Sequence, residues 1–353
     1  MIMRAGRAKQ RPVAALGIAA MIIAAMPAPG AAGEGFLEAF EDNPLTSGRF
    51  TVHDGDAGRF NYLPEVPALR VHYDTGLPTA RLVRPLCRTL TERDSFRLRI
   101  RFRINSGGFF AHAQRHAQIA FGLMNAASTG TDRVYGTTGG GAYDLVSLDY
   151  YPNITLFGGP SLGATILNRD TGAGFVAALN FPFGPESEMN DPGEGPLPLD
   201  TELQAELLYD GVSRVSTVRL WQGITTLPVN AYGDGFAPGG FDGDAATIQT
   251  AQAGAGFSVD RFAFLLWRDY SAAVSTVIAD VDFLAVQLSW QASADADLDG
   301  DVDADDFGHF QACNTGPAIP QPDEDCRWAD LDCDGDVDQE DFGRLQVQFT
   351  EEP

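Results

Sequence analysis

Apolar and polar residues alternate most clearly in Ser95–Ile104, which reads SFRLRIRFRI. Apolar side chains occupy every second position and arginines lie between them, the period of a strand with one buried face. Shorter segments of this kind, separated by Gly, Pro, Asn and Asp, are Phe36–Phe40, Ala68–Tyr73, Ala80–Arg84, Gln118–Leu123, Leu145–Tyr150, Leu203–Tyr209, Arg214–Trp221, Phe262–Trp267 and Val281–Leu288. No amphipathic helix interrupts them, so the pattern predicts an antiparallel β sandwich or jelly roll over residues 33–290.

Residues 1–32 have the composition of a secretory signal peptide. Basic residues precede the apolar segment Val13–Ala25, and small residues (PAPGAAG) follow it. The apolar segment is too short to span a bilayer comfortably, and no other is long enough. We therefore expect removal of this segment on export, a secreted or cell-surface protein and no membrane span.

Two aspartate-rich segments repeat near the C-terminus. Asp295–Asp306 reads DADLDGDVDADD and Asp330–Asp341 reads DLDCDGDVDQED, so the repeat is 330 − 295 = 35 residues. Both have Asp at positions 1, 3, 5, 7, 9 and 12 and Gly at position 6, the spacing of a 12-residue calcium loop. We predict one Ca²⁺ in each loop, with position 7 contributing its backbone carbonyl and position 9 acting through water. The predicted ligands are Asp295, Asp297, Asp299, Asp301, Asp303 and Asp306, then Asp330, Asp332, Asp334, Asp336, Asp338 and Asp341.

The net charge of −24 is concentrated in this region. Residues 291–353 contain 19 acidic and 2 basic residues, which gives −17. Such acidity argues against nucleic acid as a partner, because nucleic acid requires a basic surface. A disordered acidic tail is the alternative, but a tail has no need to keep Gly, Val and a following Phe in register twice.

The tandem loops resemble a bacterial type I dockerin over about residues 292–349. That family consists of two calcium loop–helix units that dock on a cohesin domain, so the resemblance implies a small α domain at residues 291–353 and a cohesin-like partner. Loop positions 10 and 11 of the family contact the partner and are often a Ser/Thr pair. Here these positions are Ala304, Asp305, Gln339 and Glu340, a departure that leaves the partner open.

Three segments of the predicted sandwich resemble the concanavalin A-like lectins and glucanases. They are LQAELLYDGVSRVSTVRLW (203–221), FSVDRFAFLLW (257–267) and VIADVDFLAVQL (277–288). The resemblance implies a jelly roll that binds polysaccharide. Hydrolases of this superfamily place carboxylates at alternate positions of one strand, and Asp280 and Asp282 share that spacing without an evident partner. A non-catalytic binding protein is therefore expected, with a dockerin-borne hydrolase or lyase and a structural matrix protein as alternatives.

The arginine row of Ser95–Ile104 has two interpretations. Arg97, Arg99, Arg101 and Arg103 lie on one face of the predicted strand. They could receive an anionic polysaccharide, because guanidinium groups suit carboxylates and sulfates. They could equally form a solvated or salt-bridged outer face.

Four cysteines in an exported chain permit disulfides. Cys313 and Cys326 flank the connection between the repeats and are expected to pair. Cys87 and Cys333 are left over. Cys333 occupies position 4 of the second loop, where side chains face away from the ion, so we expect it to be free or loosely paired.

Overall fold

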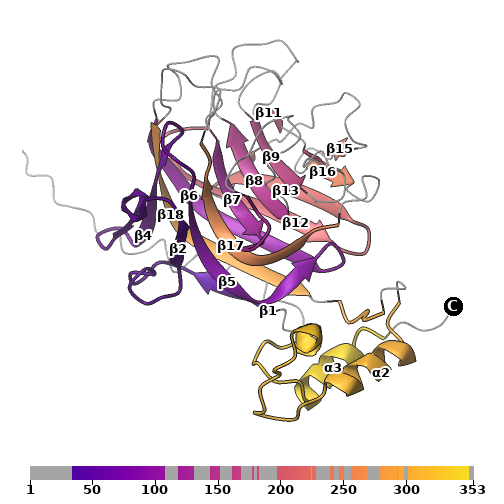
Figure 1. Ribbon diagram of the computed structural model, residues 1–353. Helices are drawn as coiled ribbons and strands as arrows, with labels where there is room; N and C mark the ends of the chain where they lie inside the picture. The colour runs from indigo at the N-terminus through magenta and orange to yellow at the C-terminus, as the bar shows by residue number, and fades with distance from the viewer. Residues whose placement is uncertain are drawn as a thin grey trace, which may run out of the picture. The chain divides into compact units, whose positions relative to one another are not determined.

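The computed structural model describes residues 34–107, 118–130, 144–151, 161–167, 177–178, 181–182, 197–223, 225–227, 239–241, 246–249, 256–268, 278–291, 293–297 and 301–349. These residues form two antiparallel sheets and a small helical part at the C-terminus (Figure 1). The predicted all-β sandwich with a small C-terminal α part is confirmed.

Sheet A contains ten described strands in the order β15-β16-β13-β12-β6-β18-β4-β3, with β1 paired to β18 and β14 paired to β13. Its central strand β6 lies between β12 and β18. The bounds are β1 Glu34–Glu38, β3 Phe60–Leu63, β4 Ala68–Asp74, β6 Ser95–Gly107, β12 Glu202–Asp210, β13 Val215–Gln222, β14 Thr225–Leu227, β15 Gly239–Phe241, β16 Ala246–Gln249 and β18 Ile278–Gln291.

Sheet B contains eight described strands in the order β10-β9-β8-β7-β17-β5-β2, with β11 paired to β9. The bounds are β2 Thr51–Asp54, β5 Ala80–Thr91, β7 Ile119–Met124, β8 Leu145–Tyr151, β9 Ser161–Leu167, β10 Ala177–Ala178, β11 Phe181–Pro182 and β17 Ser258–Leu266. A short 3-10 helix, η1, spans Ala57–Arg59. The three residues 92–94 connect β5 of sheet B to β6 of sheet A, so this corner joins the two layers.

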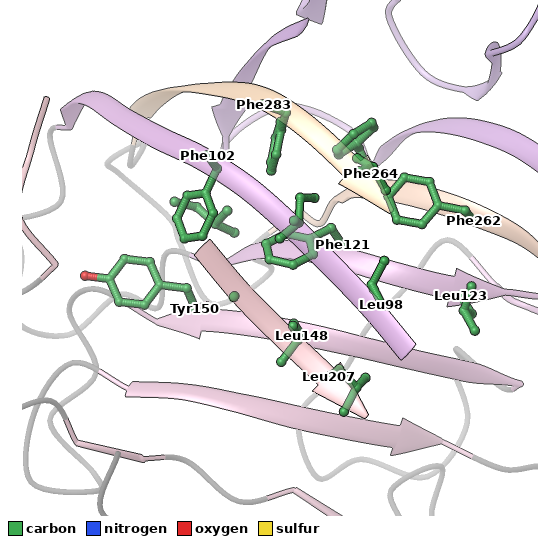
Figure 2. Packing of buried hydrophobic residues seen from close by; sticks show 14 of the residues in the cluster. Leu98, Phe102, Phe121, Leu123, Leu148, Tyr150, Leu207, Phe262, Phe264 and Phe283 are labelled. Atoms are coloured by element: carbon green, nitrogen blue, oxygen red, sulfur yellow. The ribbon is translucent and has the colours of Figure 1, made fainter. Parts of the chain in front are cut away.

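Aromatic side chains from both sheets fill the space between the layers (Figure 2). Phe264 of sheet B and Phe283 of sheet A have ring centroids 4.4 Å apart. Phe121 contacts Phe283 edge-on at 5.8 Å, and Phe102 lies 6.0 Å from Phe121. Each of these four side chains is at most 1% exposed, so their burial supplies much of the apolar driving force for packing the sheets together.

The C-terminal part has its own apolar cluster. It contains α2 (Ala304–Cys313), η4 (Glu324–Ala329) and α3 (Gln339–Gln346). Its buried residues are Ala294, Val302, Phe310, Cys313, Ala329, Leu331, Val337 and Leu345, with Phe307 and Phe342 packed against them. Phe349 lies outside this cluster: α3 ends at Gln346, so the helical period does not extend to Phe349, which is 43% exposed.

None of the helices formed by the described residues has the length and apolar character needed to cross a membrane.

Candidate calcium centre

Each aspartate-rich loop leads directly into a helix whose first turn it caps. Asp303 is the N-cap of α2 and its carboxylate accepts a hydrogen bond from Asp305 N at 2.8 Å. Asp338 does the same for α3 through Glu340 N at 2.7 Å. In both helices the position-12 aspartate accepts a bond in return from the N-cap backbone, completing a capping box. Loop position 9 is therefore fixed by the helix it begins.

The position-12 aspartates close the two loops. Asp341 is fully buried, and its carboxylate accepts bonds from Leu331 N at 2.6 Å, Asp332 N at 3.0 Å and Asp338 N at 2.7 Å. Asp306 is buried equally and accepts from Ala296 N, Asp297 N and Asp303 N. One carboxylate thus joins positions 2, 3 and 9 of its own loop, which brings the remaining carboxylates toward a common centre.

The second loop also has the turn that its glycine predicts. Gly335 has φ +96°, a conformation that side-chain-bearing residues rarely adopt, and its N–H donates to Asp330 Oδ2 at 3.1 Å. Asp332 accepts from Asp334 N at 3.2 Å, and Asp334 accepts from Asp336 N at 3.1 Å. These bonds turn successive aspartates toward the inside of the loop.

Carboxylate oxygens gather at cation-binding distances in both loops. In each of four trios, one oxygen per residue lies within 4.8 Å of the others. Calcium binds oxygen at about 2.3–2.6 Å, so ligands on opposite sides of one ion are at most about 5 Å apart. The trios are Asp295, Asp297 and Asp306; Asp301, Asp303 and Asp306; Asp330, Asp332 and Asp334; and Asp336, Asp338 and Asp341. Asp299 lies outside the described residues.

Three of the aspartates in these trios have a carboxylate oxygen without a hydrogen-bond partner. Oδ1 of Asp295, of Asp330 and of Asp336 is buried and accepts no bond. Burial raises the pKa of Asp330 and of Asp336, and the charges of neighbouring aspartates raise each further. Burial also raises the pKa of Asp341 to about 6, although three backbone N–H groups oppose this shift. A buried anionic oxygen without a donor is unfavourable, so these residues fit a hard divalent cation such as Ca²⁺.

Position 7 of the second loop differs from the expectation that only its backbone takes part. The Asp336 side chain is 4% exposed, and its Oδ2 accepts a bond from Ala318 N in the connection between the repeats. Its carboxylate therefore also joins the loop to that connection. The residues at positions 10 and 11 (Ala304, Asp305, Gln339 and Glu340) are all exposed at the beginnings of α2 and α3.

The C-terminal part is tied to the corner between β5 and β6. Cys87 of β5 forms a disulfide with Cys333, so the expectation that Cys333 is free or loosely paired is wrong. Cys333 has φ +63° and its side chain leaves the loop, as expected, but Cys87 lies where it can be reached. Arg93 Nη1 donates to Asp295 Oδ2, and Asp94 accepts from Ser293 N at 2.8 Å. The predicted disulfide between Cys313 and Cys326 is present.

A cleft of about 450 Å³ lies at this junction. The β5–β6 corner contributes Thr91 and Arg93 to its lining, and the C-terminal part contributes Asp295, Arg327 and Trp328. This cleft could not be predicted from the sequence, because its walls come from segments more than 190 residues apart.

The arginine row lies on the outer face of sheet A and is ion-paired. Arg99 and Arg97 approach Glu206, Arg101 donates to Glu202 at 2.9 Å and Arg103 donates to Asp282 at 3.0 Å; these contacts agree with a salt-bridged outer face. The two aspartates considered as a catalytic pair also have side-chain partners here. Asp282 binds Arg70 at 2.6 Å, and Asp280 contacts His72 at 2.8 Å.

No protein-family model matches the sequence, and no curated protein matches it. Among solved structures, the chain is similar to the Lotus tetragonolobus seed lectin, with 10% identity, coverage of 73% of this chain and 98% of the lectin, and a TM-score of 0.42. Lectin I-B4 from Griffonia simplicifolia in its metal-free form has 13% identity and a TM-score of 0.41, with coverage of 73% of this chain and 99% of the lectin. Winged bean acidic lectin complexed with methyl-α-D-galactose has 11% identity and a TM-score of 0.39, with coverage of 73% of this chain and 100% of the lectin. This likeness is too distant to assign a ligand to this chain.

Proposed function

We propose that this chain is an exported calcium-binding protein in which two aspartate loops fold around Ca²⁺ and anchor a polysaccharide-binding β sandwich to an extracellular partner. The observation that carries the calcium step is the set of buried carboxylate oxygens without donors at Asp295, Asp330 and Asp336. Such oxygens repel one another in the closed loop, and a divalent cation removes this repulsion. The binding free energy therefore contributes to folding of the C-terminal part.

Calcium suits these loops better than other common ions. Their donors are all oxygens, which disfavours metals that prefer thiolate or imidazole. Magnesium retains several waters and demands octahedral geometry, whereas calcium accepts six to eight oxygens in a flexible arrangement. In the second loop, Asp330, Asp332 and Asp334 would hold the ion together with oxygens from the position-7 and position-12 residues.

The calcium step can be tested by calorimetry on the exported chain, residues 33–353, stripped of metal. Titration with CaCl₂ is expected to give two binding events and a gain of helical circular dichroism. Asp332→Asn removes one charge from a carboxylate trio and is expected to abolish one event. Glu340→Gln removes the same charge from an exposed residue outside the trios, and is expected to leave both events unchanged. Absence of binding heat in the unmodified chain would refute the proposal.

The anchoring step is supported by the resemblance of the loops to dockerins and by the exposure of Ala304, Asp305, Gln339 and Glu340. Purified type I cohesin domains, immobilised as a panel, provide the test. Calcium-dependent retention that is weakened in an Asp305→Ala, Glu340→Ala variant is expected. Retention that is unaffected by calcium or by the variant would contradict docking through these positions.

A second function, a calcium-rigidified structural protein without a docking partner, is favoured by the junction with the sandwich. The Cys87–Cys333 disulfide and the Arg93–Asp295 ion pair attach both loops to the β5–β6 corner. Under this alternative, no cohesin domain retains the chain, while calcium still raises its thermal stability. The two assays together separate the alternatives.

A further inference from the structure

The outer face of sheet A carries a field of arginines that extends beyond β6. Arg70 of β4 and Arg219 of β13 join the four arginines of β6 across the sheet, because register places Arg70 beside Asp282 and Arg219 beside Glu206. At about 3.4 Å per residue and 4.8 Å per strand, the field covers about 20 Å by 19 Å. We call these six arginines the arginine face.

Two buried carboxylates lie within the arginine face. Glu206 is 1% exposed and contacts Arg99, Arg219 at 3.2 Å and Arg97 at 3.7 Å. Asp282 is fully buried and contacts Arg70 and Arg103. Five guanidinium groups thus share two carboxylates, which gives an excess of 5 − 2 = 3 positive charges.

The rim of the face reduces this excess but does not remove it. Arg101 is paired with Glu202, and Asp280 adds one more negative charge beside His72. Among the described residues joined by these contacts, six arginines therefore oppose four carboxylates, an excess of 6 − 4 = 2 with His72 neutral. This local sign is opposite to the net charge of −24 of the whole chain.

The arginines keep hydrogen-bonding capacity for a ligand. A guanidinium has five N–H donors, and a carboxylate uses at most two of them in a fork. Arg97 is the least engaged: its side chain is 41% exposed, and the 3.7 Å contact with Glu206 is too long for a hydrogen bond. Arg219 is 37% exposed, whereas Glu206 beneath it is covered. Around Glu206 and Asp282 the guanidinium groups are therefore the accessible charges, whereas at the rim Glu202 is 45% exposed and its partner Arg101 is 19% exposed.

We propose that the arginine face binds an acidic polysaccharide, whose carboxylate or sulfate groups accept hydrogen bonds from the free guanidinium N–H groups. The proposal rests on the proposed polysaccharide-binding function and names its ligand class. Gln204 and Trp221 occupy the same face between the arginines, and an amide and an indole suit sugar hydroxyls and ring faces. A small excess charge over a broad area fits one anionic group per sugar ring better than the denser phosphates of nucleic acid.

A matched set of polymers tests the ligand class. The calcium-loaded exported chain is titrated with dextran, carboxymethyl-dextran and dextran sulfate, which share one backbone and differ in charge. Binding to at least one charged polymer that is at least about tenfold tighter than to dextran, and that weakens in 0.5 M NaCl, is expected. Equal affinity for the three polymers overturns the inference and leaves glycan binding intact. Tighter binding to single-stranded DNA than to either charged polymer also overturns it.

Three variants test the surface itself. Arg97→Gln with Arg219→Gln removes two exposed charges and is expected to weaken binding to the charged polymer about tenfold. Glu202→Gln frees Arg101 and is expected to tighten binding about threefold, a gain that damage to the fold would not produce. Arg261→Gln removes the same charge from sheet B and serves as the control. Equal weakening by Arg261→Gln and the double variant overturns the proposal.

A second copy of this chain is the competing occupant, because its C-terminal part is strongly acidic. Sedimentation of the chain without polymer distinguishes the two. A monomer is expected in both the parent and the Arg97→Gln, Arg219→Gln variant. A dimer that dissociates in the variant would assign the arginine face to self-association and overturn the proposal. An unchanged calcium titration in each variant verifies that the C-terminal part is folded.

Discussion

The disulfide between Cys87 and Cys333 joins a strand of the sandwich to the second aspartate-rich loop across 246 residues. We predict that Cys87→Ala with Cys333→Ala destabilises the protein more than removal of the local disulfide between Cys313 and Cys326, whose separation is 13 residues. The perturbation is clean at both ends. Cys87 is exposed, and alanine at position 333 meets the same positive φ that cysteine does.

The magnitude follows from the restriction that each disulfide places on the unfolded chain. Loop closure removes about 2.1 + 1.5R ln n cal/mol/K of entropy, so the long crosslink contributes about 5 kcal/mol at 25 °C and the short one about 3 kcal/mol. The difference in loop length sets the expected order of the two effects. Loss of the long crosslink also frees the second loop from β5.

Guanidinium denaturation at saturating calcium, followed by tryptophan fluorescence and circular dichroism, measures the effect. The parent is expected to unfold in one transition, because the two parts are covalently and ionically joined. The Cys87→Ala, Cys333→Ala variant is expected to show a lower midpoint, with the C-terminal helices unfolding before the sheets. If this variant unfolds like the parent while Cys313→Ala with Cys326→Ala is the less stable one, the reasoning is refuted.

Three other substitutions test the sheets and the loop. Burial raises the pKa of Asp282, but hydrogen bonds from Arg70 and Arg103 outweigh this effect and lower the pKa below its ordinary value. Asp282→Asn should therefore lower the free energy of unfolding by about 3 kcal/mol at pH 7. A carboxylate whose pKa is lowered by folding stabilises the folded protein fully above about pH 4, and this stabilisation is lost as the pH falls through the folded-state pKa. The urea midpoints of the variant and the parent should therefore converge in acid. A constant difference between them down to pH 3 would contradict this. Gly122→Ala should lower the stability measured by thermal denaturation by about 2 kcal/mol, since the added Cβ would lie 2.2 Å from Val146 O. An unchanged stability would mean that β8 can shift to make room. The Cβ added by Gly335→Ala would meet open space, but the backbone would keep φ +96°, so a loss of about 1 kcal/mol of stability is expected. Calorimetry should also show weaker calcium binding. An unchanged affinity would show that this turn does not limit calcium binding by the loop.

Alternation of apolar and polar positions predicted strands such as β6 and β13, because one face of each is buried. In β6 the apolar positions are buried in the structure and the arginines face outward, as the alternation requires. All ten predicted strands are present. Seven of the eight missed strands in the described residues have four residues or fewer, too few for a clear period; β10 and β11 have two each, and β3 and β2 are four-residue edge strands. The exception is β9, which has seven residues.

Cross-strand partners could not be predicted, because register is a property of the folded sheet. Nothing in the sequence indicates that Glu206 would lie opposite Arg99. Nor does it indicate that Arg103 would donate a hydrogen bond to Asp282, which is 179 residues away. Local spacing does show which aspartates can gather in a loop, and it led to the correct disulfide between Cys313 and Cys326. It could not show that Cys87 lies beside Cys333, since that pairing requires the C-terminal part to contact β5.

The connection between the two parts decides how calcium acts on the whole chain. β18 ends at Gln291 and the first loop begins at Asp295, so three residues separate a sheet strand from a proposed calcium ligand. Arg93 holds that ligand from the sandwich side. A module on a long flexible linker would take up calcium without effect on its neighbour. Here the proposed ligand Asp295 contacts both parts, so we expect calcium binding to change the free energy of the β5–β6 corner as well as that of α2 and α3.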